Sequence, residues 1–495
     1  MTSPTFLGID LGTSELKVLL MGRQGEALGS AGAPLTVSQP HVGWSEQEPD
    51  AWVRALHSAC AELKAQHPEL WMRVAGIGLS GQMHGATLLD AANRVLRPCI
   101  LWNDTRSAHE CITLREARPD LEAITGNAAM PGFTAPKLLW VREHEPQVFA
   151  QTEKVLLPKD YLGWYLTGDY VSDMSDASGT LWLDVSKRDW SDAMLAATGL
   201  SRRHMPRLLE SAQVAGHLRG ELAQALGLPP GVVVAAGAGD NAASAIGLGA
   251  VQPGDGFISL GTSGVIFLTT EKYAPNPANA VHAFCHAAPG MWHQMAVMLS
   301  AASCLRWVTQ LTGAASEAQL LALVEKLSSQ EREAAPVFLP YLSGERTPHN
   351  DANASGAFLG LRHTHDAAHL GYSVIEGVGF GLLDGLNALR AGGGDAARLQ
   401  LVGGGAKSTL WAQLLADTLS LEVALNKVSS VGAALGAARL GQMAVEGADP
   451  LAVARICAKH EVEQVFQPQP QTHAGLMQRH ARFASSYQAL KSAGF

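Results

Sequence analysis

A tetrapeptide that occurs twice limits the possible folds of this chain more than any other feature. Leu-Gly-Thr-Ser stands at Leu11–Ser14 and again at Leu260–Ser263, about half the chain length later. Each copy lies between two apolar runs, within Phe6–Leu20 and Phe257–Leu268, and this pattern predicts a strand, a tight turn and a second strand. Two such hairpins indicate two domains of related design.

The predicted hairpin tips suit a phosphate ligand. Glycine lets backbone N–H groups face an anion, and the Thr and Ser hydroxyls add hydrogen-bond donors. Two tips from two domains would hold one polyphosphate from opposite sides, whereas ordinary hairpin turns are the alternative interpretation. The copies differ at one place, because Asp10 of the first hairpin is replaced by Ser259 in the second. One carboxylate beside a polyphosphate suits Mg²⁺, and a turn residue at a strand end is the alternative for Asp10.

The stretch Val232–Gly247 predicts a short buried strand, a glycine turn and a helix that begins near Asp240. Three interpretations of Asp240 stay open at this point. It is a helix N-cap, or a general base beside a substrate hydroxyl, or part of a dinucleotide site, because Gly237–Ala242 match G-x-G-x-x-A. The dinucleotide interpretation has a charge problem, since a carboxylate at a helix N-terminus repels the pyrophosphate.

Three other glycine-rich or polar stretches are candidates for ligand contact. Ser80–Gly85 combines Gln, Met and His and predicts either a polyol contact or a surface turn. Ile100–Arg106 places Trp, Asn and Asp at a strand end, a mixture that sugar sites favour. Leu399–Ser408 predicts a strand, a triple glycine and a helix start, which is a third candidate for phosphate or nucleoside contact. Gly247–Asp255 predicts a linker that lets two halves close on a ligand.

Composition excludes several classes of protein. The chain has 495 residues, of which 47% are hydrophobic, and this predicts two or three domains. Its net charge of −9 without a basic block disfavours nucleic acid and membranes as partners. No apolar run approaches the length of a membrane span, and the N-terminus resembles no secretion signal. The six scattered Cys predict free thiols in a reducing cytoplasm.

One His and Cys cluster has the composition of a metal site. His282, Cys285, His286 and His293 lie close together in sequence, and the first three belong to a predicted strand. Alternation along a strand places Cys285 on the face opposite His282 and His286, so packed strand residues are favoured over zinc ligands. Asp160, Asp173 and Asp176 are expected to be helix caps, and Asp173–Gly179 is expected to be a polar connector. Helices are expected over Pro49–Leu63, Ser300–Thr312, Asp366–Leu389 and Val431–Leu440, and from Gly132 and Pro158 onward.

Taken together, these motifs resemble the FGGY family of carbohydrate kinases, which has the actin-like ATPase fold. Gly8–Ser14 resembles the opening hairpin of that family, and Gly239–Asn241 resembles its catalytic turn. Gly132–His144 and Gly356–Glu376 resemble its two signature stretches. The chain has no P-loop and no protein-kinase motif, which agrees with a different architecture for ATP binding.

The resemblance implies an α/β chain with the actin-like ATPase (ribonuclease H-like) fold and a cleft between two related domains. Residues 1–248 are expected to bind the sugar and carry the catalytic Asp. Residues 249–495 are expected to bind the nucleotide and to end in a helical tail. Several long strings, among them Ser80–Asp90 and Phe338–Asn350, resemble the bacterial xylulokinases of the family most closely.

That resemblance implies transfer of the ATP γ-phosphoryl group to the 5-hydroxyl of D-xylulose, with Asp240 as the general base. It also implies a cytoplasmic homodimer. A related FGGY kinase for D-ribulose, deoxyxylulose or a polyol is the nearest alternative. An NAD-dependent oxidoreductase and a non-catalytic actin-fold ATPase are more distant alternatives from other classes.

The resemblance further implies which residues bind the two substrates. Asp10 is expected beside Mg²⁺, through water or through ATP. Glu15 departs from the small residue that is common at its position, and it adds negative charge near the phosphates. The sugar is expected to contact Met83, His84, Asn103, Asp104, Asp240 and Asn241. The nucleotide is expected to contact Asp10, Gly12, Thr13, Ser14, Lys17, Gly261, Thr262, Gly404, Gly405 and Ala406.

Overall fold

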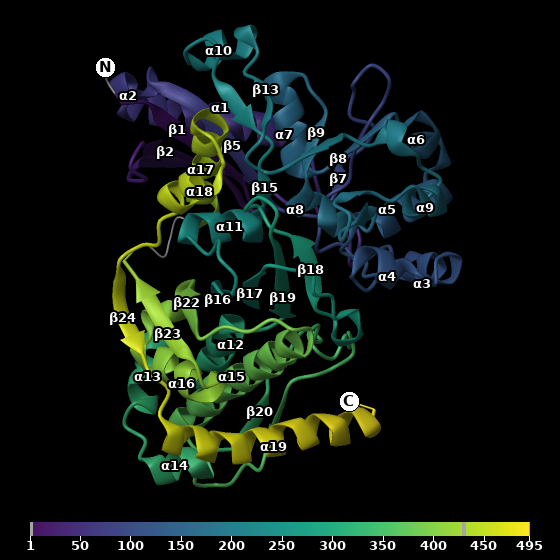
Figure 1. The fold of residues 1–495 in the computed structure, drawn as a ribbon. Helices are drawn as coiled ribbons and strands as arrows, with labels where there is room; N and C mark the ends of the chain where they lie inside the picture. The colour runs from purple at the N-terminus through teal and green to yellow at the C-terminus, as the bar shows by residue number, and fades with distance from the viewer. Residues whose placement is uncertain (1–2, 428–431, 495) are drawn as a thin grey trace.

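The computed structural model describes residues 3–427 and 432–494. It contains two large seven-stranded sheets, one above the other in Figure 1. The first sheet consists of β1 (Thr5–Leu11), β2 (Glu15–Gly22), β3 (Ala27–Pro34), β5 (Val74–Gly81), β13 (Val214–His217), β14 (Val233–Ala235) and β15 (Ala238–Gly239). The second consists of β16 (Gly256–Leu260), β17 (Gly264–Thr270), β18 (His282–Cys285), β19 (Trp292–Met298), β22 (Arg398–Val402), β23 (Glu422–Asn426) and β24 (Val462–Phe466).

The two sheets have the same strand order around the two hairpins. In the first sheet the order is β3-β2-β1-β5-β14-β13, with β15 also paired to β5, and in the second it is β18-β19-β17-β16-β22-β23-β24, where β18 is an additional edge strand. Strands β1 and β2 pair antiparallel and β1 pairs parallel with β5, as β16 does with β17 and with β22. Both predicted hairpins are therefore present. The shared order follows from two related strand sequences that fold in the same way.

Helices cover the faces of both sheets. The predicted helices are present, with bounds that differ from the expected ones by a few residues. They are α1 (Pro49–Gln66), α5 (Thr134–His144), α7 (Pro158–Thr167), α11 (Asp240–Leu248), α12 (Ala302–Thr312), α15 (Ala367–Ala391) and α17 (Gly432–Glu446). Val431, where the last of these was expected to begin, lies outside the described residues. Further helices include α3 (Ala108–Ala117), α8 (Met174–Ala177), α16 (Thr409–Leu419), α18 (Pro450–Ile456) and α19 (Pro470–Ser492).

Helix α17 comes from the C-terminal half of the chain, yet it packs on the first sheet and on α11 (Figure 1). Glycines make this approach possible. A Cβ added at Gly8 would lie 1.8 Å from the carbonyl oxygen of Ala434, and one at Gly436 would lie 1.7 Å from that of Ala243. Only a residue without a side chain fits at these contacts. Helix α17 therefore packs closely on the backbone of β1 and of α11, and this packing joins the two halves of the molecule.

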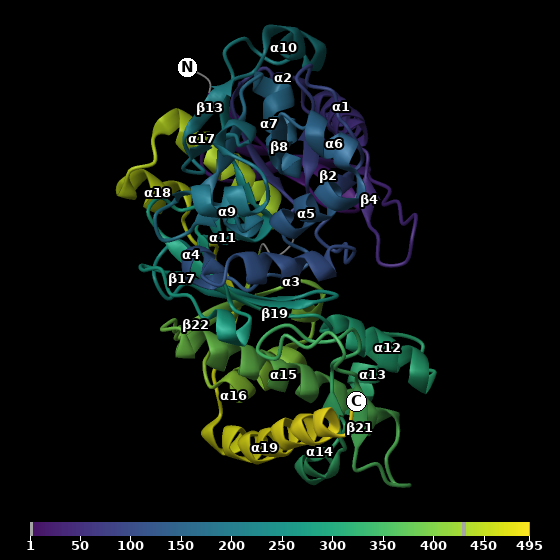
Figure 2. The same cartoon turned by 90° about the vertical axis from the view of Figure 1, so that its right-hand side faces the viewer.

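The first two residues of the expected linker, Gly247 and Leu248, belong to α11, and the rest of the linker follows that helix. Helix α11 stops at Leu248, and Gly249 follows in the left-handed conformation with φ 72°. The division of the chain at residue 248 stays a prediction. Views from two sides place α19 at the end of the molecule away from the first sheet (Figures 1 and 2). Among the described residues, no helix is both long and apolar enough to span a lipid bilayer.

One expected connector has a different structure. The segment Asp173–Gly179 was expected to be a polar turn, but it forms the short helix α8 and a 3-10 turn, and it is almost entirely buried. The physical reason is a buried lysine, described below, which pairs with two of its aspartates. That pairing lets a polar sequence enter the interior.

Candidate active site

Three neighbouring parallel strands end at one edge of the first sheet and bring two acids together. In their pairing, Asp10 of β1 lies opposite Ser80 of β5, and Ser80 lies opposite Ala238 of β15. The chain turns after β15 and begins α11 at Asp240. The carboxyl ends of parallel strands are where open α/β sheets place their ligand sites. Asp10 and Asp240 therefore face the same edge.

Asp240 is the first residue of α11, while Gly239 is the N-cap and makes no side-chain capping bond. Burial, together with the negative charge of Asp10, raises the pKa of Asp240 to about 6. The backbone N–H and the side-chain Nδ2 of Asn241 both donate to Oδ1 of Asp240, at 2.7 and 2.9 Å. A carboxylate with a fixed orientation and a pKa just below neutrality suits general base chemistry.

Asp10 has a buried carboxylate oxygen without a partner. Its Oδ1 accepts no hydrogen bond from any described residue. Burial raises the pKa of Asp10, while the neighbouring Ser80 hydroxyl and the charge of Lys17, directly opposite on β2, lower that pKa. Leaving a buried charged acceptor unpaired costs about 1–3 kcal/mol or more. A hydrated divalent cation would satisfy this oxygen, so the residue fits the predicted magnesium position.

The turn after β5 places Met83 and His84 beside the Asp240 turn. A Cβ added at Gly239 would lie 2.8 Å from Sδ of Met83, so this side chain lies directly on the backbone before Asp240. His84 adopts φ 70°, and its Nδ1 lies 2.7 Å from the carbonyl oxygen of Gly179. Burial lowers the pKa of His84 to about 3, so the ring is neutral. A neutral imidazole and a thioether are suitable contacts for a sugar.

Two residues from α5 hold the backbone of His84. Nζ of Lys137 donates to the His84 carbonyl oxygen at 2.8 Å, and Oγ1 of Thr134 donates to it at 3.2 Å. The His84 ring lies edge-on to Phe133 and to Phe284 of the second sheet. The turn that follows β5 and carries Met83 and His84 is therefore held in place from both halves of the chain.

Asn103 and Asp104 lie in different environments. Asn103 is exposed, whereas Asp104 is buried and accepts hydrogen bonds from the Ser45 backbone and from the Arg106 side chain. Their contact with sugar stays a prediction. Their neighbour Trp102 reaches the first hairpin tip, where its Nε1 donates to Oγ1 of Thr13 at 3.0 Å.

The first hairpin tip is tied down by side chains. Oγ1 of Thr13 donates to Oε1 of Gln82 at 3.2 Å, and Nε2 of Gln47 donates to the Thr13 carbonyl oxygen at 2.6 Å. Ser14 is exposed beside them. The side chain of Glu15 lies over Gly32 of β3, because a Cβ added at that glycine would lie 1.9 Å from Oε1 of Glu15. The extra carboxylate therefore points onto β3.

The second tip lies against the triple glycine that was predicted separately. The carbonyl oxygens of Gly261 and Thr262 accept hydrogen bonds from the backbone at the start of α12. Gly403 adopts φ 92°, and a Cβ on it would lie 2.6 Å from the carbonyl oxygen of Leu260. Gly404 is exposed, with no atom near its missing side chain. The candidate nucleotide residues Gly261, Thr262, Gly404, Gly405 and Ala406 thus gather at the ends of β16 and β22.

A buried ion cluster behind Asp240 is absent from the sequence prediction. Nζ of Lys159 lies 2.5 Å from Oδ1 of Asp160, 2.9 Å from Oδ1 of Asp173 and 3.7 Å from Oδ2 of Asp176. All four side chains are buried. Asp173 also caps α8, as expected, and Asp160 accepts from the Leu157 backbone. A lysine in the apolar string VLLPKDYL was the signal that could have indicated a buried ion pair.

This cluster supports the turn that carries Asp240. Asp173 accepts a hydrogen bond from Oγ of Ser175 at 2.5 Å, and that hydroxyl accepts from the backbone N–H of Gly239 at 3.2 Å. The negative charge of Asp240 is among the causes that keep the pKa of Asp176 well above its ordinary value, with burial the largest. The cluster therefore fixes the residue that immediately precedes the candidate base.

His282, Cys285, His286 and His293 form no group of converging ligands in the part of the chain that the structure describes. His282 stacks on Phe284 instead, and burial lowers its pKa well below the ordinary value.

Comparison with known proteins agrees with this geometry. The model of the N-terminal domain of the FGGY family of carbohydrate kinases matches residues 5–247, and the model of its C-terminal domain matches residues 256–445. The chain belongs to the FGGY family of carbohydrate kinases. As a family member it is an ATP-dependent sugar kinase, and the predicted enzyme class is confirmed.

Several relatives of this FGGY kinase are similar over nearly their whole length. It is 50% identical to the xylulose kinase of Escherichia coli strain K12, over 98% of this chain and 99% of the relative. It is 53% identical to the xylulose kinase of Klebsiella pneumoniae, over 89% and 90% of the two chains.

Solved structures of sugar kinases confirm the predicted actin-like ATPase fold. A crystal structure of a "xyloylose kinase" from Brucella ovis superimposes with a TM-score of 0.95 at 50% identity, covering 99% of this chain and 100% of the other. A xylulose kinase from Rhodospirillum rubrum superimposes with a TM-score of 0.91 at 29% identity, covering 99% of both chains.

Proposed function

We propose that this FGGY kinase transfers the γ-phosphoryl group of ATP to the 5-hydroxyl of D-xylulose. The observation that carries the proposal is the identity of 50% to a relative named xylulose kinase, over 98% of this chain. The geometry supports it, because the partly buried carboxylate of Asp240 has a pKa of about 6 and directly follows Gly239, the residue against which Met83 packs. The alternative of an NAD-dependent oxidoreductase has no such support.

Asp240 is the general base in this proposal. Its carboxylate, ionised above pH 6, accepts the proton of the sugar hydroxyl while that oxygen forms a bond to the γ-phosphorus. The bond between the γ-phosphorus and the bridging oxygen breaks, and ADP leaves. In a loose transition state the proton moves late, so a base adds roughly 10²–10⁴-fold and positioning supplies more. Asn241 holds the carboxylate oxygen in place.

The sugar is bound by Met83 and His84, with Asn103, Asp104 and Asn241 as further contacts. The fixed left-handed backbone of His84 and its neutral ring support this assignment. A neutral imidazole donates one hydrogen bond and accepts another, and its Nδ1 is already engaged with Gly179. The Nε2 atom is therefore the one left for a sugar hydroxyl.

The nucleotide lies between the two hairpin tips in this proposal, with the triple glycine beneath it. Gly12, Thr13, Ser14 and Lys17 hold it from the first tip, and Gly261, Thr262, Gly404, Gly405 and Ala406 from the second. When bound, Mg²⁺ neutralises charge on the phosphates. Asp10 would hold it, through water or through ATP, because its unpaired buried oxygen needs a cation.

An ADP-release assay with a panel of ketoses and polyols tests the substrate. With Mg-ATP, we expect the highest kcat/KM for D-xylulose and lower values for D-ribulose, deoxyxylulose and polyols. A higher value for one of those sugars would replace D-xylulose as the substrate and leave the kinase class intact. ADP release that no sugar stimulates would contradict the kinase proposal itself.

We further propose that residues 1–248 and 249–495 are the two domains, and that the kinase acts as a homodimer in the cytoplasm. Light scattering after gel filtration gives the molar mass directly, and a single species near 52.2 kDa would contradict the dimer. Limited proteolysis that cuts first within Gly247–Asp255 would support the domain boundary.

A further inference from the structure

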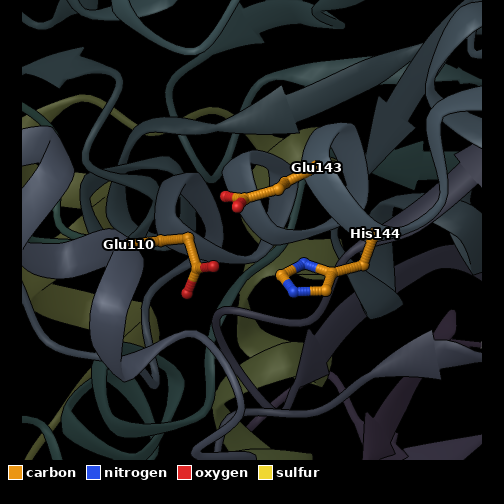
Figure 3. A group of neighbouring side chains, drawn as sticks. All are labelled: Glu110, Glu143 and His144. Atoms are coloured by element: carbon orange, nitrogen blue, oxygen red, sulfur yellow. The ribbon is translucent and has the colours of Figure 1, made fainter.

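Two neighbouring helices outside the proposed active site bring three metal-binding side chains together. Glu110 lies on α3, and Glu143 and His144 end α5. One ligand atom from each lies within 4.8 Å of the others, and the three side chains point toward a common space (Figure 3). This is the one such group that the described residues contain.

Glu110 is buried without a partner. Only 3% of its surface is exposed, and its Oε2 accepts no hydrogen bond from any residue in the described ranges. Among the described residues, no salt bridge includes Glu110. A buried carboxylate is stable only when it is paired with a cation or with donors. Its position beside Glu143, another carboxylate, makes the need for a cation greater.

His144 is oriented as a metal ligand would be. Its Nδ1 lies 3.1 Å from the carbonyl oxygen of Trp140, and its ring stacks on the Trp140 indole at 4.7 Å with an interplanar angle of 10°. A hydrogen bond from one ring nitrogen to a backbone carbonyl fixes the tautomer that leaves the other nitrogen as the ligand. Nε2 of His144 is that free nitrogen.

We propose that Glu110, Glu143 and His144 bind a zinc ion that links α3 to α5. Two carboxylates and one neutral imidazole carry a charge of −2, which a divalent ion balances. Zinc bonds of about 2.0–2.2 Å place tetrahedral ligands roughly 3.4 Å apart, within the limit of 4.8 Å observed here. Imidazole favours zinc over the Mg²⁺ that accompanies ATP, and water completes the coordination.

The zinc ion would be structural. Helix α5 carries Thr134 and Lys137, which hold the backbone of His84, and α3 packs along α5. An ion at the far end of α5 would hold this helix against α3. Removing the ion should therefore lower the melting temperature, while Mg-ATP-dependent turnover continues.

Zinc binding to the full chain, stripped with a chelator, tests the proposal. Titration calorimetry in the presence of millimolar Mg²⁺ should give one equivalent of bound zinc and a rise in melting temperature. His144→Ala should weaken zinc binding at least about 10-fold, the loss that even a supporting residue causes. His109→Ala is the matched control, because His109 is exposed on the same helix as Glu110 and is not among the three ligands.

Glu110→Gln provides the second variant. It keeps the shape of the side chain and removes its charge, so it should fold and should also lose zinc at least about 10-fold. Failure of the wild-type chain to bind one equivalent of zinc would overturn the proposal. Binding of equal strength in His144→Ala and Glu110→Gln would overturn it as well, because the ion would then lie elsewhere.

Discussion

The two Gly-Thr-Ser tips have the same sequence and the same place in their sheets, but they are held in different ways. Side chains hold the first tip, where Gln82 and Trp102 bond to Oγ1 of Thr13. Two backbone amides at the start of α12, together with the Ser303 hydroxyl, donate to the backbone carbonyls of Gly261 and Thr262 and so hold the second tip. The tetrapeptide thus determines the conformation of the turn, while residues outside it determine which parts of the protein are hydrogen-bonded to each tip. Gln82 belongs to the loop of Met83 and His84, so the first tip is connected to the proposed sugar site.

The two halves also differ in charge. The first sheet carries Asp10 and Asp240 at its edge, whereas Ser259 occupies the position that corresponds to Asp10 in the second sheet. Two acids near each other in a partly buried site raise the free energy of the folded state, and the pKa of both acids is raised. We infer that the first half contains the acidic chemistry and that the second contributes neutral backbone contacts.

Removing the proposed base from the first half should lower activity more than any other change predicted here. Asp240→Asn should lower kcat by about 10²–10⁴-fold, because the proton of the sugar hydroxyl then has no acceptor. Binding of ATP, measured by titration, should change little, since the nucleotide contacts lie at the two tips. A turnover rate close to that of the wild type would show that Asp240 is not the general base.

The pKa of Asp240 predicts opposite pH effects on activity and on stability. Below about pH 6 the base is protonated, so kcat/KM should fall as the pH falls through 6. Since the folded-state pKa is raised, the folded protein binds this proton more tightly than the unfolded chain does. The resulting stability is present at low pH and is lost as the pH rises through 6.

Asp240→Asn should therefore be more stable than the wild type at pH 8, by up to about 3 kcal/mol, and should match it at pH 4. Urea unfolding at the two pH values measures the difference. A variant that is less stable than the wild type at pH 8 would show that the raised pKa is wrong.

The pair Asp10→Asn and Ser259→Ala tests the charge difference directly. Asp10→Asn should lower kcat/KM by about 10²-fold, because the proposed cation loses its protein carboxylate. Ser259→Ala, at the corresponding place in the second sheet, should change it less than about 3-fold. Raising the Mg²⁺ concentration should restore part of the activity of the first variant only. Equal losses in the two variants would show that the charge difference between the halves has no functional meaning.

How much the sequence revealed depended on whether a contact is local. The hairpins, the turn before Asp240 and the glycine stretch at Gly404 follow from residues close together in the chain, and these were predicted. The pairing of Lys159 with Asp173 was missed, because nothing in either local pattern indicates the partner. The packing of α17 on the first sheet was missed for the same reason, since its glycine contacts join residues more than 400 positions apart, as at Gly8.

Within the first half, a substitution of His84 tests whether this residue contacts the sugar or the nucleotide. His84→Asn should raise the sugar KM roughly 10-fold and change the ATP KM little, because one hydrogen bond to the sugar is lost. Asparagine tolerates the left-handed backbone at φ 70°, so the loop should keep its conformation. His84→Ala should show the same order with some added strain. A larger rise in the ATP KM than in the sugar KM would place His84 at the nucleotide.

The smallest predicted effect returns to the two tips. Thr13→Ala removes a hydroxyl that bonds to Gln82 and Trp102, so it should raise the KM values of both sugar and ATP about 3-fold. Thr262→Ala removes a hydroxyl from a tip that α12 holds through the tip's backbone carbonyls, so it should raise the ATP KM by a similar factor and leave the sugar KM unchanged. Steady-state kinetics with both substrates varied distinguishes the two patterns. If both variants changed the same KM values, the different hydrogen bonds that hold the two tips would not correspond to different roles in substrate binding.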